Sequence, residues 1–317
     1  MLVTKEGQHT PEDGGIKLYT KTWKTDGPPK AVIVFVHGFS DHCNAYYGFF
    51  PALASYGIEV RAFDQRGWGK SVTSPSSRGL TGSTETVLKD IHSFLTSTYS
   101  SLKEQASAEG SAESTIPPVF LMGHSMGGAE VLYYMLNSPD FPPWVRGVLA
   151  YSPLIALHPD SAPYRLTVFM GRLAARLRPQ HQLFKALDPL TMCRDVRVCE
   201  EWKNDPLCHD TGTLEGLAGM LDRAAWLDAL QHTPKMESQA TALWVCHGTA
   251  DRVNDFDASR RFTEAASVSD STFQKYDGGY HKLHAEPDGI KEALVKDVAE
   301  WVLARSGVDE GSAKAKL

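Results

Sequence analysis

Residues 120–130 read FLMGHSMGGAE, and the surroundings of Ser125 decide how the rest of the chain is interpreted. A short apolar run precedes Gly123, and a helix-forming run follows Gly127. A serine between two glycines is weak evidence by itself, because this chain is rich in both residues. A strand, a tight turn and a helix in sequence would hold the hydroxyl of Ser125 on a sharp bend, which is the geometry of a nucleophile elbow.

Short apolar runs rich in β-branched residues alternate with helical patterns along the chain. This alternation is typical of a parallel sheet that is covered by helices on both faces. We expect strands at residues 16–23, 31–36, 58–63, 119–122, 145–151, 242–246 and 273–276, and helices at 84–99, 126–137 and 290–304. Residues 1–15 read as a polar, mobile start, and residues 103–118 as a surface loop.

The alternation is interrupted at about residues 156–235, which are rich in Leu and Arg, helical in pattern and without a convincing strand. Chemistry in open parallel sheets takes place at the carboxyl ends of the strands. An insertion after the 145–151 strand would therefore lie over the predicted active site. We predict a core formed by residues 1–155 and 236–317, with a helical cap at 156–235.

Length, charge and cysteine content narrow the class of protein. The 317 residues can form one large core with a smaller appended unit, and the net charge of −6 argues against general nucleic-acid binding. No apolar stretch approaches the roughly 20 residues that span a bilayer, and the N-terminus lacks the apolar segment of a signal peptide. Five scattered cysteines without a C-x-x-C pair indicate reduced thiols in an intracellular protein, and no His/Cys cluster has zinc spacing.

A serine hydroxyl is a poor nucleophile unless a base takes its proton and an acid orients that base. The segment HGTADRVNDF (247–256) offers Asp251 directly after a strand, with Asp255 and Asp257 as alternatives. The segment GGYHKLHAEPD (278–288) offers His281 at a loop tip, with His284 as the alternative. The order serine, acid, histidine along the chain is that of α/β-hydrolases. We prefer Asp251 and His281.

An oxyanion in such a site needs two backbone N–H donors. One is expected at Met126, directly after the serine, and the other at Phe39 in the loop that follows the 31–36 strand. His37, in the same loop, is expected to be a buried brace rather than a participant. His124 is expected to pack away from the hydroxyl.

Seven segments carry a resemblance to a known family. They are HGFSDH (37–42), FDQRGWGKS (63–71), VFLMGHSMGG (119–128), YSPLI (151–155), NDPL (204–207), HGTADRV (247–253) and YHKLHAEP (280–287). In this order the chain resembles the serine hydrolases of the α/β-hydrolase superfamily, and among them the monoacylglycerol lipases and their lysophospholipase-like relatives. The resemblance implies an α/β-hydrolase fold, a mostly parallel sheet flanked by helices, with a helical cap insertion.

The resemblance also implies roles for individual residues. Ser125, Asp251 and His281 would form the catalytic triad, with Phe39 and Met126 as oxyanion donors. Asp41 and His284 would be partners for the glycerol hydroxyls of a monoglyceride. The similar lipases have an arginine a few residues after the HG loop, whereas Ala45 stands near that place here.

The activity implied by the resemblance is hydrolysis of a lipid ester, foremost monoacylglycerol to fatty acid and glycerol, through an acyl-enzyme on Ser125. It requires no metal and no organic cofactor. Alternative substrates are another acyl ester, a specialised-metabolite ester or an acyl thioester. A peptidase is less favoured, because Glu200 and Glu201 are the only adjacent acidic pair in the cap. A binding protein without catalytic activity is disfavoured, because the triad residues are all present. Dehalogenases and epoxide hydrolases are also disfavoured, because they have aspartate where this chain has Ser125.

Two further segments bear on partners and location. Residues 164–178 (YRLTVFMGRLAARLR) carry one helical apolar face edged by arginines, formed by Leu166, Phe169, Met170, Leu173, Leu177, Arg165, Arg172 and Arg176. This helix either packs on the pocket or inserts its apolar face into a membrane or lipid droplet.

The tripeptide Ala315–Leu317 resembles the S-K-L signal for import into peroxisomes, and the alternative is a frayed polar tail without a targeting role. We expect a cytoplasmic or lipid-associated protein, with peroxisomal import as a further option.

Overall fold

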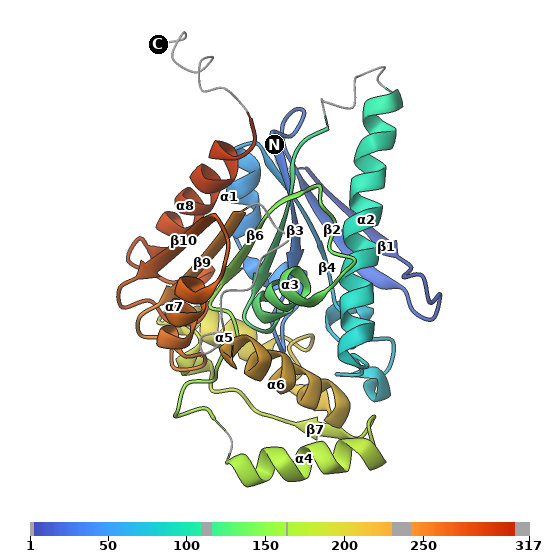
Figure 1. The fold of residues 1–317 in the computed structure, drawn as a ribbon, viewed down its shortest axis with the longest axis vertical. Helices are drawn as coiled ribbons and strands as arrows, with labels where there is room; N and C mark the ends of the chain where they lie inside the picture. Colours follow the sequence, from blue (N-terminus) through green and yellow to red (C-terminus); the bar gives the residue numbers. More distant parts are fainter. Residues whose placement is uncertain (1–2, 109–115, 163, 230–241, 308–317) are drawn as a thin grey trace.

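A computed structural model describes residues 3–108, 116–162, 164–229 and 242–307 of the chain. Within these residues, eight strands form one twisted sheet in the order β1-β2-β4-β3-β5-β6-β9-β10 (Figure 1). The strands are β1 Val3–His9, β2 Leu18–Lys24, β3 Ala31–Val36, β4 Ile58–Phe63, β5 Val119–His124, β6 Val145–Tyr151, β9 Ala242–Gly248 and β10 Asp270–Tyr276. Neighbours from β4 to β10 run parallel, and β1 and β2 are antiparallel to their neighbours. The predicted α/β class is confirmed.

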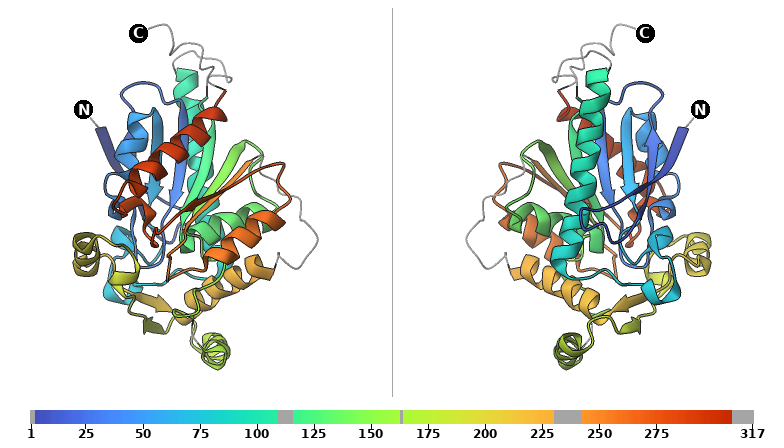
Figure 2. Two further views of the ribbon diagram at one scale, coloured as in Figure 1. Left: turned by 90° about the vertical axis from the view of Figure 1, so that its left-hand side faces the viewer. Right: turned by 90° about the vertical axis from the view of Figure 1, so that its right-hand side faces the viewer.

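Helices cover both faces of the sheet, and the alternation within each strand explains why. In β3, Val32, Val34 and Val36 belong to one buried cluster, whereas Ile33 and Phe35 belong to the other. Successive side chains of a strand point to opposite faces, so an apolar run of this kind needs cover on both. The covering helices are α1 Phe49–Ser55, α2 Thr84–Ala108, α3 Met126–Asn137, α7 Phe256–Ala265 and α8 Ile290–Ala304. Helices α1 and α8 lie on one face, and α2, α3 and α7 on the other (Figure 2).

Two expectations about local structure before β5 are wrong. The start of the chain is not a mobile segment, because Val3–His9 forms β1 and pairs along its whole length with β2. Its side chains are mostly exposed, so the apolar alternation that predicts a strand is missing. Helix α2 continues to Ala108, nine residues past the predicted end at Tyr99, because residues such as Leu102, Lys103 and Glu104 favour helix. The remainder of the expected 103–118 loop is only partly described.

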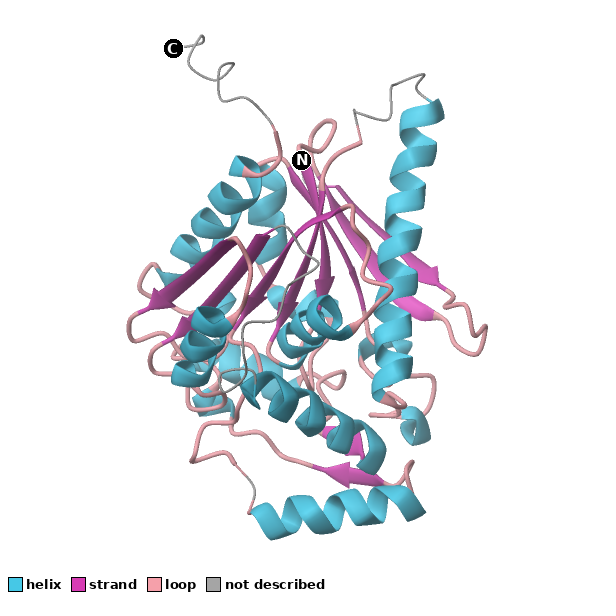
Figure 3. Cartoon of the chain, viewed as in Figure 1, coloured by secondary structure: helices cyan, strands magenta, loops and turns pink. Residues whose placement is uncertain are grey.

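The chain between β6 and β9 forms a separate group of elements at the carboxyl ends of the parallel strands (Figure 3). It contains helix α4 Arg165–Leu177, strand β7 Gln182–Phe184, helix α5 Val196–Asn204, strand β8 Thr211–Thr213 and helix α6 Leu214–Ala229. Strands β7 and β8 pair with each other, which corrects the expectation of a strand-free insertion. Three-residue strands are too short to show a period-2 pattern, so they could not be predicted from the residue types.

In the described part of the chain, no helix has the length and apolar character that crossing a membrane requires.

Candidate active site

Ser125 lies on the bend between β5 and α3. β5 ends at His124 and α3 begins at Met126, so one residue makes the whole turn, with φ +56° and ψ −117°. Positive φ is unfavourable for a non-glycine residue and often accompanies function. The turn also brings backbones into close contact. A Cβ on Gly123 would lie 2.3 Å from the carbonyl oxygen of Gly127, and one on Gly127 would lie 2.3 Å from that of Val36.

Three side chains from distant parts of the chain meet at this bend. The Ser125 hydroxyl donates to His281 Nε2 at 2.9 Å, and His281 Nδ1 donates to Asp251 Oδ2 at 2.8 Å. His281 lies in the loop after β10, and Asp251 follows β9. All three residues are buried, which keeps water from competing for these hydrogen bonds. The serine, base and acid thus have the relative positions that nucleophilic catalysis requires.

The alternatives to His281 and Asp251 lie elsewhere. His284 donates or accepts at the Tyr151 hydroxyl, 3.0 Å from its Nδ1, rather than at Ser125. Asp255 is the N-cap of α7 and accepts from the Ala258 amide. Asp257 is exposed and pairs with Arg260 on the same helix at 3.3 Å.

The Asp251 carboxylate has more partners than the triad requires. Oδ1 accepts from the amides of Val253 and Asn254 at 2.8 and 3.0 Å, and Oδ2 also lies 2.9 Å from His247 Nε2. Burial alone would raise the pKa of Asp251. The charge of His281 and the hydrogen bonds from His247 and His281 outweigh burial and lower that pKa below its ordinary value. The carboxylate is therefore ionised at neutral pH and can accept the hydrogen bond from His281.

His247 is a site residue that the sequence analysis missed. It is fully buried at the end of β9, and its second ring nitrogen, Nδ1, lies 2.8 Å from the Ser259 hydroxyl. The only sequence signal was its place four residues before Asp251 in HGTAD, which does not distinguish a site residue from a core residue. Its hydrogen bond fixes the carboxylate that orients His281.

We expect His247→Leu to lower kcat about tenfold, because one hydrogen bond to the orienting carboxylate is lost. His247→Gln, whose amide can still donate to Asp251, should keep more of the rate. Both variants are compared on a short soluble ester, with kcat expressed per active site titrated by a fluorophosphonate. An unchanged kcat in His247→Leu would show that the other partners of Asp251 suffice.

The two expected oxyanion donors belong to backbone segments that adjoin Ser125. Met126 is the first residue of α3, so its amide is one of the helix N–H groups that have no acceptor within the helix. Phe39 lies in the loop after β3, and its ring packs edge-on against Trp68 with centroids 4.8 Å apart. A Cβ on the preceding Gly38 would lie 3.1 Å from the Ser125 Cβ, so this loop passes very near the nucleophile.

His37 and His124 are buried and occupied with structural partners, in agreement with the sequence analysis. His37 Nε2 accepts from the Gln65 amide at 2.9 Å, and Nδ1 donates to the Gly38 carbonyl at 2.8 Å. His124 stacks on Tyr151 with centroids 4.5 Å apart. Burial lowers the pKa of both imidazoles, so both are neutral.

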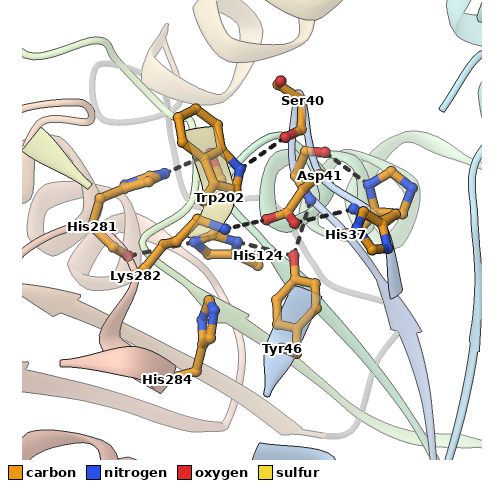
Figure 4. A network of polar contacts seen from close by, with 12 residues as sticks. His37, Ser40, Asp41, Tyr46, His124, Trp202, His281, Lys282 and His284 are labelled. Carbon is orange, nitrogen blue, oxygen red and sulfur yellow. Dashed lines mark hydrogen bonds and ion pairs between the residues drawn. The ribbon is translucent and has the colours of Figure 1, made fainter. Parts of the chain in front are cut away.

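The two residues expected to contact a substrate alcohol, Asp41 and His284, are both buried. Tyr46 packs against His284 with ring centroids 4.6 Å apart, and both appear with Asp41 in Figure 4. His284 also borders a cavity of about 350 Å³ between α1, α5 and α8. Asp41 is buried, and its Oδ2 receives a hydrogen bond from Lys282 Nζ at 2.8 Å.

His42, Asp205 and Cys208 bring three candidate metal-ligand atoms within 4.8 Å of one another. His42 Nδ1 accepts from the Asn44 amide at 3.3 Å, so Nε2 carries the proton that it donates to Asp205 at 2.9 Å. An Nε2 with a proton has no lone pair for a metal. The cluster is better described as a hydrogen-bonded contact between the loop after β3 and the insertion.

The fold and the site together define a serine hydrolase of the α/β-hydrolase class. The chain belongs to the Hydrolase_4 family, described as serine aminopeptidase S33, whose model matches residues 27–288. A relative from Schizosaccharomyces pombe is 34% identical over 296 residues, which cover 92% of this chain and 73% of the relative.

Two further similarities concern named lipases. The monoglyceride lipase of Rattus norvegicus is 27% identical over 308 residues, covering 97% of this chain and 91% of that protein. The crystal structure of a soluble variant of monoglyceride lipase from Saccharomyces cerevisiae, in complex with a substrate analog, aligns with a TM-score of 0.83. That alignment has 23% identity and covers 96% of this chain and 97% of the yeast chain, so it supports the fold.

Proposed function

We propose that this protein hydrolyses monoacylglycerol to fatty acid and glycerol, with Ser125, His281 and Asp251 as its catalytic triad. The observation that carries the proposal is the continuous hydrogen-bonded path from the Ser125 hydroxyl through His281 to Asp251. The substrate class is supported by the name of the similar protein from Rattus norvegicus.

The proposed reaction has two steps. His281 Nε2 takes the proton as the Ser125 oxygen attacks the ester carbonyl, and the amides of Phe39 and Met126 stabilise the resulting oxyanion. His281 then protonates the departing alcohol, which leaves an acyl-enzyme on Ser125. Water, activated by the same imidazole, attacks the acyl group and releases the fatty acid. Asp251 stabilises the imidazolium without itself becoming protonated.

We propose that the leaving glycerol lies toward Asp41 and His284. Asp41 accepts from the His42 amide and from Lys282, and a carboxylate still has free lone pairs after two such bonds. His284 borders a cavity that also includes Tyr47 and Phe49. Ala45, near the place of the arginine in similar lipases, is buried and offers no hydrogen bond from its side chain.

A substrate panel tests this proposal. Purified protein is given monoacylglycerols of several chain lengths, acyl-CoA, a short soluble ester and an aminoacyl-arylamide, with Ser125→Ala measured beside it. Monoacylglycerol turnover that disappears in Ser125→Ala supports the proposal. Faster turnover of acyl-CoA would favour the thioester alternative, and turnover of the short ester alone would reject the lipid substrate.

Peptidase activity is the second candidate, because the family description names an aminopeptidase. Such an enzyme needs an acidic group that binds the free amine of its substrate. Glu200 and Glu201 on α5 are exposed, and the buried Asp41 is already paired with a lysine. We therefore favour an ester over a peptide, and the arylamide in the panel distinguishes them.

We propose that residues 156–235 act as a cap over the site, on a core of residues 1–155 and 236–317. This division is supported by the position of α4, α5 and α6 at the carboxyl ends of the strands, where Ser125 lies (Figure 3). Contacts from α5 reach the loop after β3, since Trp202 Nε1 donates to the Ser40 carbonyl at 3.1 Å.

We further propose that α4 binds a lipid surface. Its apolar face, formed by Leu166, Phe169, Met170, Leu173 and Leu177, is 46% to 80% exposed, which disfavours the alternative that this face packs on the pocket. Helix α4 lies at the outer end of the molecule, beyond α6 (Figures 1 and 2). Tyr164, directly before α4, and Phe184 of β7 are also exposed. Arg172 pairs with Asp222 of α6, and exposed Arg176 is available to lipid phosphates.

We expect Phe169→Ser with Leu173→Ser to lower binding to phosphatidylcholine–phosphatidylserine vesicles at least tenfold, because two large apolar side chains no longer leave water. Hydrolysis of a short soluble ester should stay within about threefold, since α4 is remote from Ser125. The matched control replaces Val3 and Tyr56, two exposed apolar residues outside the insertion, with serine. It should bind the vesicles as the wild type does. Equal vesicle binding by the α4 variant would reject the proposal.

Import into peroxisomes is proposed from the last three residues alone. Ala315–Leu317 lies outside the residues that the structure describes, so the proposal still depends on the sequence. A fluorescent protein carrying the last ten residues should collect in peroxisomes, and one ending in Lys316 should not. Diffuse fluorescence from both fusions would indicate a cytoplasmic or lipid-associated protein.

A further inference from the structure

Lys282 is a buried lysine beside the proposed catalytic base. It follows His281 in the chain, and its Nζ donates to Asp41 Oδ2 at 2.8 Å (Figure 4). Both side chains are at most 3% exposed. A buried ammonium is tolerated only with a charged or well-bonded partner, so the position of Lys282 depends on Asp41. The two residues are 241 positions apart, and their ion pair joins the loop after β10 to the loop after β3.

Asp41 belongs to the loop that carries the proposed oxyanion donor. Phe39 is two residues before it, and Ser40, between them, has a left-handed backbone with φ +51°. That conformation is unfavourable for serine and persists only where neighbouring contacts hold it. Asp41 itself accepts from the next amide, that of His42, at 3.1 Å. A displacement of Asp41 would therefore be transmitted to the Phe39 amide through only two residues.

The insertion covers this ion pair and holds both loops. The Trp202 ring of α5 lies 5.4 Å from Lys282 Nζ, and its Nε1 donates to the Ser40 carbonyl at 3.1 Å. The Lys282 amide donates to the Met192 carbonyl at 2.7 Å. The Asp210 amide donates to the Ser40 hydroxyl at 2.9 Å. The same region of the insertion thus contacts the loop of the base and the loop of the oxyanion donor.

We propose that Lys282 is a positioning residue, whose ion pair with Asp41 under Trp202 fixes the Phe39 amide relative to His281. The inference rests on the proposed function, because it assigns a task to residues near that triad. An oxyanion donor must lie within about 2.7–3.1 Å of the developing charge to stabilise it. A misplacement of about 1 Å can lower the rate about 10²-fold. The insertion would then complete the catalytic site as well as roof it.

The rival explanation is that this ion pair only stabilises the fold. Removing one partner of a buried pair destabilises a protein strongly, whereas replacing both with neutral residues is often harmless. A purely stabilising pair therefore predicts that a neutral double variant regains both stability and activity. A positioning pair predicts that it regains stability but not activity, because the link between the two loops is still absent.

The experiment compares Lys282→Met with the double variant Lys282→Met, Asp41→Asn. We measure the thermal midpoint, kcat and KM on a short soluble ester, and the rate at which a fluorophosphonate labels Ser125. We expect Lys282→Met to lower kcat and the labelling rate at least tenfold, with KM changed by less than about threefold. The double variant should recover most of the thermal midpoint while kcat stays at least tenfold low.

The matched control is Arg66→Met, which breaks the largely buried ion pair between Arg66 and Asp90 at 2.9 Å. It should lower the thermal midpoint and leave kcat per labelled site unchanged. A double variant with wild-type kcat would overturn the inference, and so would a folded Lys282→Met with wild-type kcat. If Lys282→Met does not fold, the kcat of the double variant tests the inference. The readouts need no lipid, so failure on monoacylglycerol would reject the substrate and not this inference.

Discussion

Ser125→Ala is expected to lower kcat for ester hydrolysis by about 10⁴–10⁶-fold, because removal of the attacking oxygen leaves only substrate binding and the oxyanion donors. The fold should persist. Alanine fits the space of serine, and the glycine contacts that shape the turn involve the backbone of Gly123 and Gly127. The variant should also fail to react with a fluorophosphonate. Turnover of a short ester and mass spectrometry of the probe-treated protein measure the two effects.

A matched serine in the same sheet provides the control. Ser152 directly follows β6, the neighbour of β5, and it too is buried with a positive φ of +45°. Its hydroxyl has no hydrogen-bond partner among the described residues. Ser152→Ala should therefore keep kcat within about threefold, since nothing in the reaction uses that oxygen. A Ser125→Ala protein that kept more than about one hundredth of the rate and still took up the probe would remove Ser125 as nucleophile.

Asp251→Asn is expected to lower kcat by about 10³–10⁴-fold, because the NH₂ group of asparagine cannot accept the hydrogen bonds that one of the two carboxylate oxygens receives. Donors surround the carboxylate: the Val253 and Asn254 amides at Oδ1, and His247 and His281 at Oδ2. Either orientation of the asparagine places its NH₂ group against two of these donors. When the NH₂ group stands at the place of Oδ2, the imidazole of His281 loses the tautomer whose Nε2 accepts from Ser125.

The effect should lie in kcat rather than in KM, since Asp251 does not touch the substrate. Stability should also fall, because buried donors are left without an acceptor. Activity is therefore expressed per site that reacts with the probe, and folding is checked by near-ultraviolet circular dichroism. Asp257→Asn, on the exposed face of α7, is the control and should be active. Similar rates in the two variants would contradict the role of Asp251.

The central strands and the elbow could be predicted because their signals are local. Strands β3, β4 and β6 begin and end at the predicted residues, because each is a short, largely buried run that contains β-branched residues. Helix α3 also matches its prediction. The preference for His281 over His284 followed from its place at a loop tip directly after the strand. These inferences need only the residue types and their spacing.

Edge and surface elements were less predictable. Strand β1 exists because its backbone pairs with β2, and no apolar pattern accompanies that pairing. The apolar face of α4 was visible in the sequence, but whether it packs on the protein or lies exposed depends on where the helix is held. The same periodicity is compatible with both arrangements.

By itself, the sequence determined a parallel α/β sheet, a strained turn at Ser125, and the identity of a histidine and an aspartate that could serve it. Only the tertiary structure decided that His247 supports Asp251 and that Lys282 pairs with Asp41. It also decided that the insertion contacts the loops on either side of the nucleophile. Burial and hydrogen bonds between residues far apart in the chain depend on how the helices and strands pack. They therefore cannot be predicted from the spacing of residues within one segment.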